Sequence, residues 1–169
     1  MTYQAATDRV IAIIEATTRD EASLPKTRGL FGTSLPFVFD EVSSGTRNRV
    51  GNIEGDELTQ ARAFSLTGIG TELAEHTYTP GARIRYDDVE IMIQYPPAKS
   101  ARDLDLVMHD DAALIQGRLM TESLWDRPTS TIESIGWPAP LTLPIEYVST
   151  ANGRATLIRV RIRHTEATS

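Results

Sequence analysis

The stretch from Ile84 to Leu124 contains the two clearest periodicities of the chain, one directly after the other. From Asp88 to Tyr95, every second position is polar except Met92. Val89, Ile91, Ile93 and Tyr95 occupy the positions between them. This period of two is expected of a strand with one buried face. Pro96 and Pro97 then end the strand, because neither has a backbone N–H to donate. The pattern predicts a strand over residues 84–95.

A helix is predicted immediately after this strand. Ser100 followed by Asp103 is a variant of the capping box that begins a helix. Beyond it, apolar residues recur at helical spacing, whereas the acids, Gln116 and Arg118 fall mostly elsewhere. The apolar set is Leu104, Val107, Met108, Ile115 and Leu119. A strand therefore leads directly into an amphipathic helix.

The size and composition of the chain favour one domain, residues 1–169, with a sizeable core. The absence of cysteine excludes disulfides and a thiolate metal site. No apolar run approaches the roughly 20 residues that a membrane helix needs, and the N-terminus lacks the features of a signal peptide. A net charge of -6 argues against tight non-specific binding to a phosphate backbone over the whole surface. We therefore expect a protein without membrane contact that stays in the cytoplasm unless it leaves inside an assembly.

The N-terminal part contains a helix, a short strand and a polar segment. Residues 2–17 predict a short amphipathic helix with Val10, Ile13 and Ile14 on one face. Prolines and glycines punctuate residues 24–36, which indicates a surface loop, and residues 37–39 are interpreted as the beginning of a strand. Residues 43–60 combine serine, glycine, asparagine and charges with few apolar residues. This segment is interpreted either as a hairpin tip or as an arm that orders against a partner subunit.

A further strand is predicted before the Ile84 strand. Residues 62–66 alternate and predict a strand that ends near Gly68 and Gly70. Residues 72–78 are interpreted as a helical turn or a loop. Pro80 and Gly81 then indicate a turn into the next strand.

Asn152 and Gly153 predict a closing hairpin, because they are the preferred pair for a type I′ turn. In that register, three apolar pairs face each other, namely Tyr147 with Ile158, Ile145 with Val160, and Leu143 with Ile162. The other face sets Glu146 opposite Arg159, Pro144 opposite Arg161, and Thr142 opposite Arg163. Pro144 would then occupy a non-hydrogen-bonded pair, with its missing donor turned away from the partner strand. We therefore expect this strand to lie at the edge of a sheet.

Together these elements predict an α+β fold, in which two main helices pack on an antiparallel or mixed β-sheet. The last strand would present a basic row, Arg159, Arg161 and Arg163, on one face. One interpretation is a surface for phosphate or an acidic partner. The alternative is pairing within the sheet, because Glu146 faces Arg159 and the Ile84 strand offers Asp88 and Glu90.

Acidic residues crowd the predicted strand and helix, which suggests a metal-dependent nuclease as one hypothesis. They are Asp87, Asp88, Glu90, Asp103, Asp105, Asp110 and Asp111. Such a site needs carboxylates that converge with a lysine or histidine at fixed spacing. Neither Lys26 nor Lys99 follows an acid in the Asp/Glu-x-Lys arrangement, and His109 has no second histidine at ligand spacing. We therefore expect no catalytic metal and no cofactor, and interpret the acids as a solvated helix face.

Other catalytic signatures are absent from the sequence. The Gly68, Ile69, Gly70 stretch lacks the third glycine and the helix start of a dinucleotide fingerprint. There is no Gly-x-Ser-x-Gly nucleophile elbow. Trp125 and Trp137 are interpreted as core or loop anchors that also lie near the candidate edge strand.

The layout as a whole resembles the tail terminator, or tail-completion, proteins of long-tailed bacteriophages. The resemblance spans most of residues 5–164 and rests on a pattern of elements rather than on an invariant motif. These elements are a short N-terminal helix, a hairpin arm, the strand 62–66, the strand 89–95, the helix containing DLDLVMHDDAALIQGRL, and a two-stranded close. The loop at 24–36 and the arm around 43–60 are longer than in the family's pattern.

The resemblance implies a structural virion protein and not an enzyme. In that family a homo-oligomeric ring, usually a hexamer, caps the tail tube, stops its polymerisation and meets the head-neck connector, while DNA passes through the lumen without specific binding. Such a protein would assemble in the host cytoplasm and end in the virion. Candidate interface residues are Arg159, Arg161, Arg163, Arg47, Arg49 and Trp137.

Three alternatives remain open. One is a neck or head-completion ring at the same junction, which has the same overall pattern. The second, from a different class, is a small metal-dependent phage nuclease built on the acid-rich strand and helix. The third is a monomeric cellular binding domain that shares the layout.

Overall fold

The computed structural model describes residues 2–17, 37–39, 62–76, 82–95, 101–138, 143–151 and 153–167. Its helices are α1 (Thr2–Glu15), α3 (Ala101–Leu119), the 3-10 helix η2 (Glu122–Leu124) and α4 (Arg127–Ser130). Its strands are β1 (Phe37–Phe39), β2 (Arg62–His76), β3 (Ala82–Tyr95), β4 (Ile132–Gly136), β5 (Ile145–Thr150) and β6 (Gly153–Ala167).

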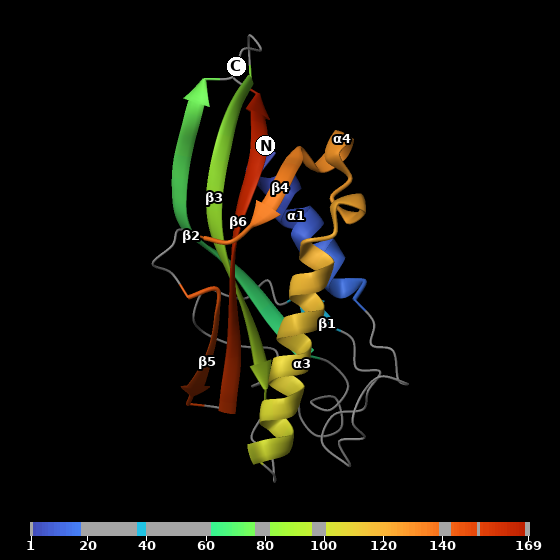
Figure 1. The fold of residues 1–169 in the computed structure, drawn as a ribbon, viewed down its shortest axis with the longest axis vertical. Helices are drawn as coiled ribbons and strands as arrows, with labels where there is room; N and C mark the ends of the chain where they lie inside the picture. The colour runs from blue at the N-terminus through green and yellow to red at the C-terminus, as the bar shows by residue number, and fades with distance from the viewer. Residues whose placement is uncertain are drawn as a thin grey trace.

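The strands form one mixed sheet in the order β1-β2-β3-β6-β4, with β5 also paired to β6. β1 runs parallel to β2, and every other pairing is antiparallel. The two long helices, α1 and α3, lie on the same side of this sheet (Figure 1). The predicted α+β class, with two main helices on a mixed sheet, is therefore confirmed.

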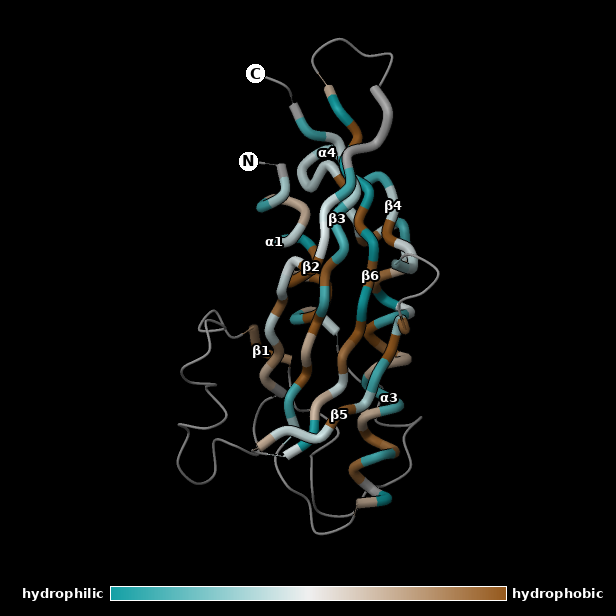
Figure 2. The backbone as a smooth tube through the Cα atoms, turned by 90° about the vertical axis from the view of Figure 1, so that its left-hand side faces the viewer, coloured by the Kyte–Doolittle hydropathy of each residue, from teal (hydrophilic) through white to brown (hydrophobic). Residues whose placement is uncertain are grey.

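Along the central strand β3, side chains alternate between the two faces of the sheet, as the sequence pattern predicts. Every odd-numbered residue from Asp87 to Tyr95 is buried under the helices, and the even-numbered residues between them are partly exposed on the opposite face. The predicted apolar face of α3 is also buried, from Leu104 to Leu119, and meets the face of α1 that carries Val10 and Ile14. In Figure 2, hydrophobic and hydrophilic stretches alternate along β3 and β6. The core thus occupies the space between the helices and one face of the sheet.

The prediction for residues 62–76 is partly wrong. The strand does not end near Gly68 and Gly70, and residues 72–76 form neither a helical turn nor a loop, because β2 continues to His76. Its register against β3 shifts between Gly68 and Gly70. The extra residue at this β-bulge lets the strand bend and continue, and glycine is the residue type that tolerates such a site.

The closing hairpin exists, but its predicted register is wrong. Ile145 pairs with Ile158 and Thr150 pairs with Gly153, so β5 is displaced by two residues from the predicted alignment. Gly153 has a φ of 143°, which glycine adopts readily, and it forms the first residue of β6 rather than part of the connection. A shift of two residues keeps every side chain on its predicted face, so the apolar and polar patterns do not distinguish the two registers.

The predicted pairs of Leu143 and Pro144 with the outer half of β6 are also wrong. β4, which was not predicted, occupies that place, with Ile135 opposite Ile162 and Gly136 opposite Arg161. The carbonyl of Pro144 accepts a hydrogen bond of 2.8 Å from the N–H of Arg159. The missing donor of the proline therefore faces β6, which explains why the β5 ladder begins only after it.

Several predictions lie outside the described residues. These are the loop at 24–36, the polar arm around 43–60, Thr142 opposite Arg163, the turn at Pro80 and Gly81, and the helix cap at Ser100.

Candidate functional site

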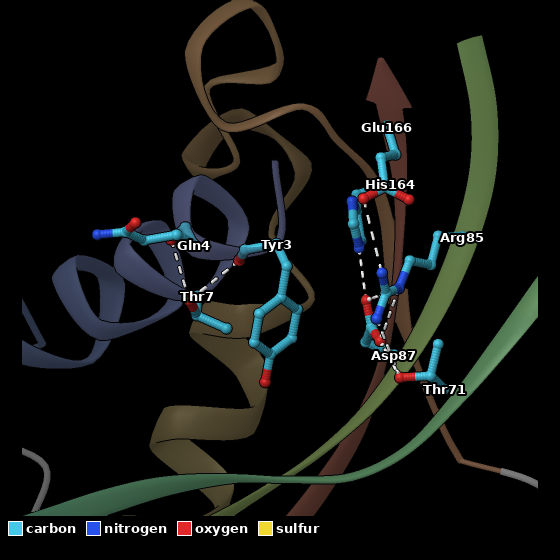
Figure 3. Close-up of polar contacts among 8 residues, drawn as sticks. All are labelled: Tyr3, Gln4, Thr7, Thr71, Arg85, Asp87, His164 and Glu166. Atoms are coloured by element: carbon cyan, nitrogen blue, oxygen red, sulfur yellow. Dashed lines mark hydrogen bonds and ion pairs between the residues drawn. The ribbon is translucent and has the colours of Figure 1, made fainter. Parts of the chain in front are cut away.

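A buried polar cluster lies at one end of the helix-covered face of the sheet (Figure 3). Asp87 of β3 and His164 of β6 are 2% and 0% exposed, and the Nε2 atom of His164 lies 2.6 Å from the Oδ2 atom of Asp87. The hydroxyl of Thr71 on β2 donates to Oδ1 of Asp87 at 2.6 Å. The Nε atom of Arg85 lies 3.2 Å from the same carboxylate. Asp87 therefore joins three adjacent strands through its side chain.

The first turn of α1 lies over this cluster. The ring centroid of Tyr3 is 6.5 Å from that of His164, and the guanidinium of Arg85 is 6.0 Å from the Tyr3 centroid. A Cβ atom at Gly68 would lie only 2.9 Å from the hydroxyl oxygen of Tyr3. Burial and the negative charge of Asp87 raise the pKa of Tyr3 above its ordinary value. The glycine in β2 thus makes room for the tyrosine that packs over the contact between Asp87 and His164.

The charge of Asp87 is stabilised by its partners. Burial alone would raise the pKa of this carboxyl group, because a dry environment disfavours the charged form. Hydrogen bonds from Thr71 and His164, together with the positive charge of Arg85, outweigh this effect and hold the pKa of Asp87 below its ordinary value. Asp87 is therefore an ionised, satisfied carboxylate rather than a proton donor near neutral pH.

This lowered pKa predicts an acid-labile contribution to stability. A carboxyl group with a folded-state pKa below its unfolded value stabilises the fold above about pH 4, and this contribution is lost as the pH falls through the folded-state pKa. We expect the difference in unfolding free energy between the wild type and Asp87→Asn to shrink as the pH falls below about 4, because the carboxyl group of the wild type is then protonated. Urea unfolding followed by circular dichroism measures it. Asp8→Asn, at an exposed position on α1, is the matched control, and an Asp87→Asn curve parallel to the wild type throughout would contradict the prediction.

The opposite face of the sheet carries the predicted arginine row. The Nε atom of Arg159 lies 2.7 Å from Glu90, and its Nη1 atom lies 3.0 Å from Glu146. Burial alone would lower the pKa of Arg159, but the hydrogen bonds and charges of both glutamates raise it above its ordinary value. The predicted contact between Glu146 and Arg159 thus forms, although Leu157 is the residue directly opposite Glu146.

The other two arginines are paired in the same way. Arg161 makes a two-pronged contact with Asp88, at 2.7 and 2.9 Å, and lies 3.1 Å from Glu72. The hydrogen bond with Asp88 is the largest reason why the pKa of Arg161 is raised. The Nε atom of Arg163 lies 3.1 Å from Glu133. Pairing within the sheet, the alternative to a free basic surface, is therefore confirmed for the whole row.

The two predicted tryptophans have different environments. Trp125 is buried, and its indole N–H donates to the carbonyl of Leu119 at 2.7 Å, so it satisfies a free carbonyl at the end of α3. Trp137 follows β4 directly and is 48% exposed. The remaining candidate interface residues, Arg47 and Arg49, lie outside the described residues.

Asp105 and Asp111 of α3 contact different neighbours. Asp105 pairs with Arg154 of β6, and Asp111 accepts a hydrogen bond of 2.8 Å from the hydroxyl of Tyr95. His109 lies 2.9 Å from the hydroxyl of Tyr147 on β5. Within the part of the chain that the structure describes, no three histidine or acidic side chains are placed to hold a metal ion.

The site that sequence reasoning missed is the Asp87–His164 pair. Both residues occupy core positions of their strands, since Asp87 precedes Val89 by two residues and His164 follows Ile162 by two. A period of two extended to both strand ends would have placed them on the buried face.

No protein-family model matches the chain, and no curated protein matches it at a significant level. None of the described helices combines the length and the apolar character needed to cross a membrane.

Proposed function

We propose that the chain is a structural subunit of a ring that caps the tail tube of a long-tailed bacteriophage, terminates its polymerisation and joins it to the head-neck connector. Two features together support this most. The arginines on the polar face of the sheet are paired with carboxylates, and one strand, β5, lies at an edge of the sheet. Such a domain offers surfaces for assembly, while both carboxylate oxygens of the buried Asp87 already have hydrogen-bond partners within the domain.

The electrostatics of the sheet are compatible with DNA that passes without specific binding. Each arginine of the row faces at least one carboxylate at close range. Paired guanidinium groups have little remaining attraction for phosphates, and the net charge of the chain is -6. A lumen lined by such a surface would let DNA slide.

The proposal places the protein in the virion, at the junction of tail and neck, after assembly in the host cytoplasm. A neck or head-completion ring at the same junction is the nearest alternative, since it uses the same kind of subunit. The nuclease alternative gains no support, because Asp105 and Asp111 each engage a different neighbour.

Light scattering of the purified protein, alone and with tail-tube protein, tests the proposal. With tube protein present, we expect a closed homo-oligomer, hexameric by the family resemblance, or a complex that stops tube growth at a fixed length. Tubes assembled without the protein are the control for length. A protein that neither binds tubes nor changes their length would contradict the tail-terminator function, and binding to purified connector alone would favour the neck ring.

A further inference from the structure

The outer edge of β5 has no neighbouring strand among the described residues. β5 pairs with β6 on one side only, and in Figure 1 it lies on the side of β6 away from β3. The hydrogen bond between Pro144 and Arg159 fixes which backbone groups face β6, because these groups alternate along an antiparallel strand. Even-numbered residues of β5 bond to β6. The N–H and C=O groups of Ile145, Tyr147 and Ser149 therefore point outward, and none of them bonds to another described residue.

The other sheet edges are protected. At β1, the carboxylate of Glu15 on α1 accepts a hydrogen bond of 3.2 Å from the N–H of Phe39. At β4, the register against β6 shifts between Ile132 and Ser134, and a bulge of this kind discourages edge pairing. One edge is thus capped by a side chain and another is irregular.

β5 has none of these protections. Its sequence, IEYVST, contains no proline and no lysine, and its register with β6 has no shift. Its one charge, Glu146, is already engaged by Arg159. A regular edge whose outward donors and acceptors bond to no described residue is a template for pairing with another strand.

We propose that a second copy of this chain occupies the edge, with the two β5 strands antiparallel about a twofold axis at Tyr147. In this register Tyr147 faces the same residue of the partner copy, and Ile145 faces Ser149. All three are outward-facing positions, so each pair would exchange both of its backbone hydrogen bonds. The two sheets would become one continuous sheet.

The side chains of β5 are self-complementary in this register. On the helix-covered face, the two Tyr147 rings lie directly opposite each other, and aromatic cross-strand pairs are favourable. On the other face Glu146 lies opposite Val148, so the symmetry brings no like charges together. The side-chain pattern and the outward backbone groups of β5 therefore favour the same antiparallel register, centred on Tyr147.

This contact is independent of the proposed ring. A ring with a single rotation axis is built from head-to-tail contacts, whereas a twofold contact is self-complementary and closes on two copies. The β5 pairing therefore belongs to the free subunit, and it would have to open before β5 contacts a neighbouring subunit in the ring.

Sedimentation velocity of the free protein over a range of concentrations, without tube protein, tests the inference. We expect a dimer, and we expect Ser149→Pro to raise its dissociation constant about 30-fold, because one outward N–H is removed in each copy. The N–H of this residue does not bond to β6, so the β5–β6 ladder remains. Ser149→Ala keeps the N–H and is the matched control. A wild type that stays monomeric, or a dimer that Ser149→Pro leaves unchanged, would overturn the inference.

Single cysteine variants test the register, because the chain has no cysteine of its own. Paired Cα atoms about 5.5 Å apart at the twofold axis are within disulfide range. We expect Tyr147→Cys to form a disulfide-linked dimer on mild oxidation and Ser149→Cys not to, because residue 149 lies opposite residue 145 of the partner. Equal cross-linking of both variants would overturn the register. Failure of the ring proposal would leave these outcomes unchanged, since no tube protein is present.

Discussion

Asp87→Ala is expected to lower the free energy of unfolding by about 3–5 kcal/mol, the range for removing one partner of a buried ion pair. The carboxylate accepts hydrogen bonds from Thr71, Arg85 and His164 at once. Without it, the imidazole of His164, which is fully buried, loses its partner at Nε2. Urea unfolding at pH 7, followed by circular dichroism, measures the loss.

Two further variants identify the origin of this effect. Asp87→Asn keeps the shape and an acceptor for the Thr71 hydroxyl but loses the charge, so a smaller loss of about 1–3 kcal/mol is expected. Asp8→Ala, at an exposed position on α1, should change stability by no more than about 0.5 kcal/mol. If Asp87→Ala were no more harmful than Asp8→Ala, the cluster would not stabilise the fold.

The elements with long, regular periods could be predicted from the sequence. The alternation that ends at Tyr95 specifies β3, and the helical spacing from Leu104 to Leu119 specifies α3, because each pattern extends over enough residues to define one face. Helix α1 and the start of β2 were found for the same reason. The α+β class follows from these elements alone.

The errors arose where tertiary pairing overrides local signals. The glycines of β2 indicated an end, yet pairing with β3 carries the strand through a bulge between Gly68 and Gly70. In the hairpin, two registers that differ by two residues leave the same side chains on the same faces. Only the backbone shows that Gly153 belongs to β6 and that β4 takes the place assigned to Leu143.

The candidate site was also predicted in part. The arginine row and its partners Asp88, Glu90 and Glu146 follow from the sequence pattern, and the structure confirms these contacts. Glu133, which pairs with Arg163, lies on β4, a strand that was not predicted. The Asp87–His164 pair was missed, because its two residues are 77 positions apart and no local pattern links them. The tail-terminator function stays a prediction, since it rests on the layout of elements rather than on a motif.

Ile91→Ala is expected to lower the free energy of unfolding by about 2–5 kcal/mol. Ile91 is fully buried in the central strand β3, directly opposite Ile158 of β6 on one side and Leu66 of β2 on the other. Truncation removes buried methyl groups and leaves a cavity between the sheet and the helices, where close packing prevents the neighbours from filling it.

Met92→Ala is the matched control, because it truncates the next residue of the same strand on the opposite, partly exposed face. A loss of about 1 kcal/mol or less is expected there, since its side chain lies outside the core. Urea unfolding of both variants measures the difference between the two faces. Equal losses would contradict a single core under the helices, and the ion-paired face of the sheet would then have to be buried as well. A large loss for Ile91→Ala alone would place the core of the domain between the helices and the face of β3 that carries Ile91.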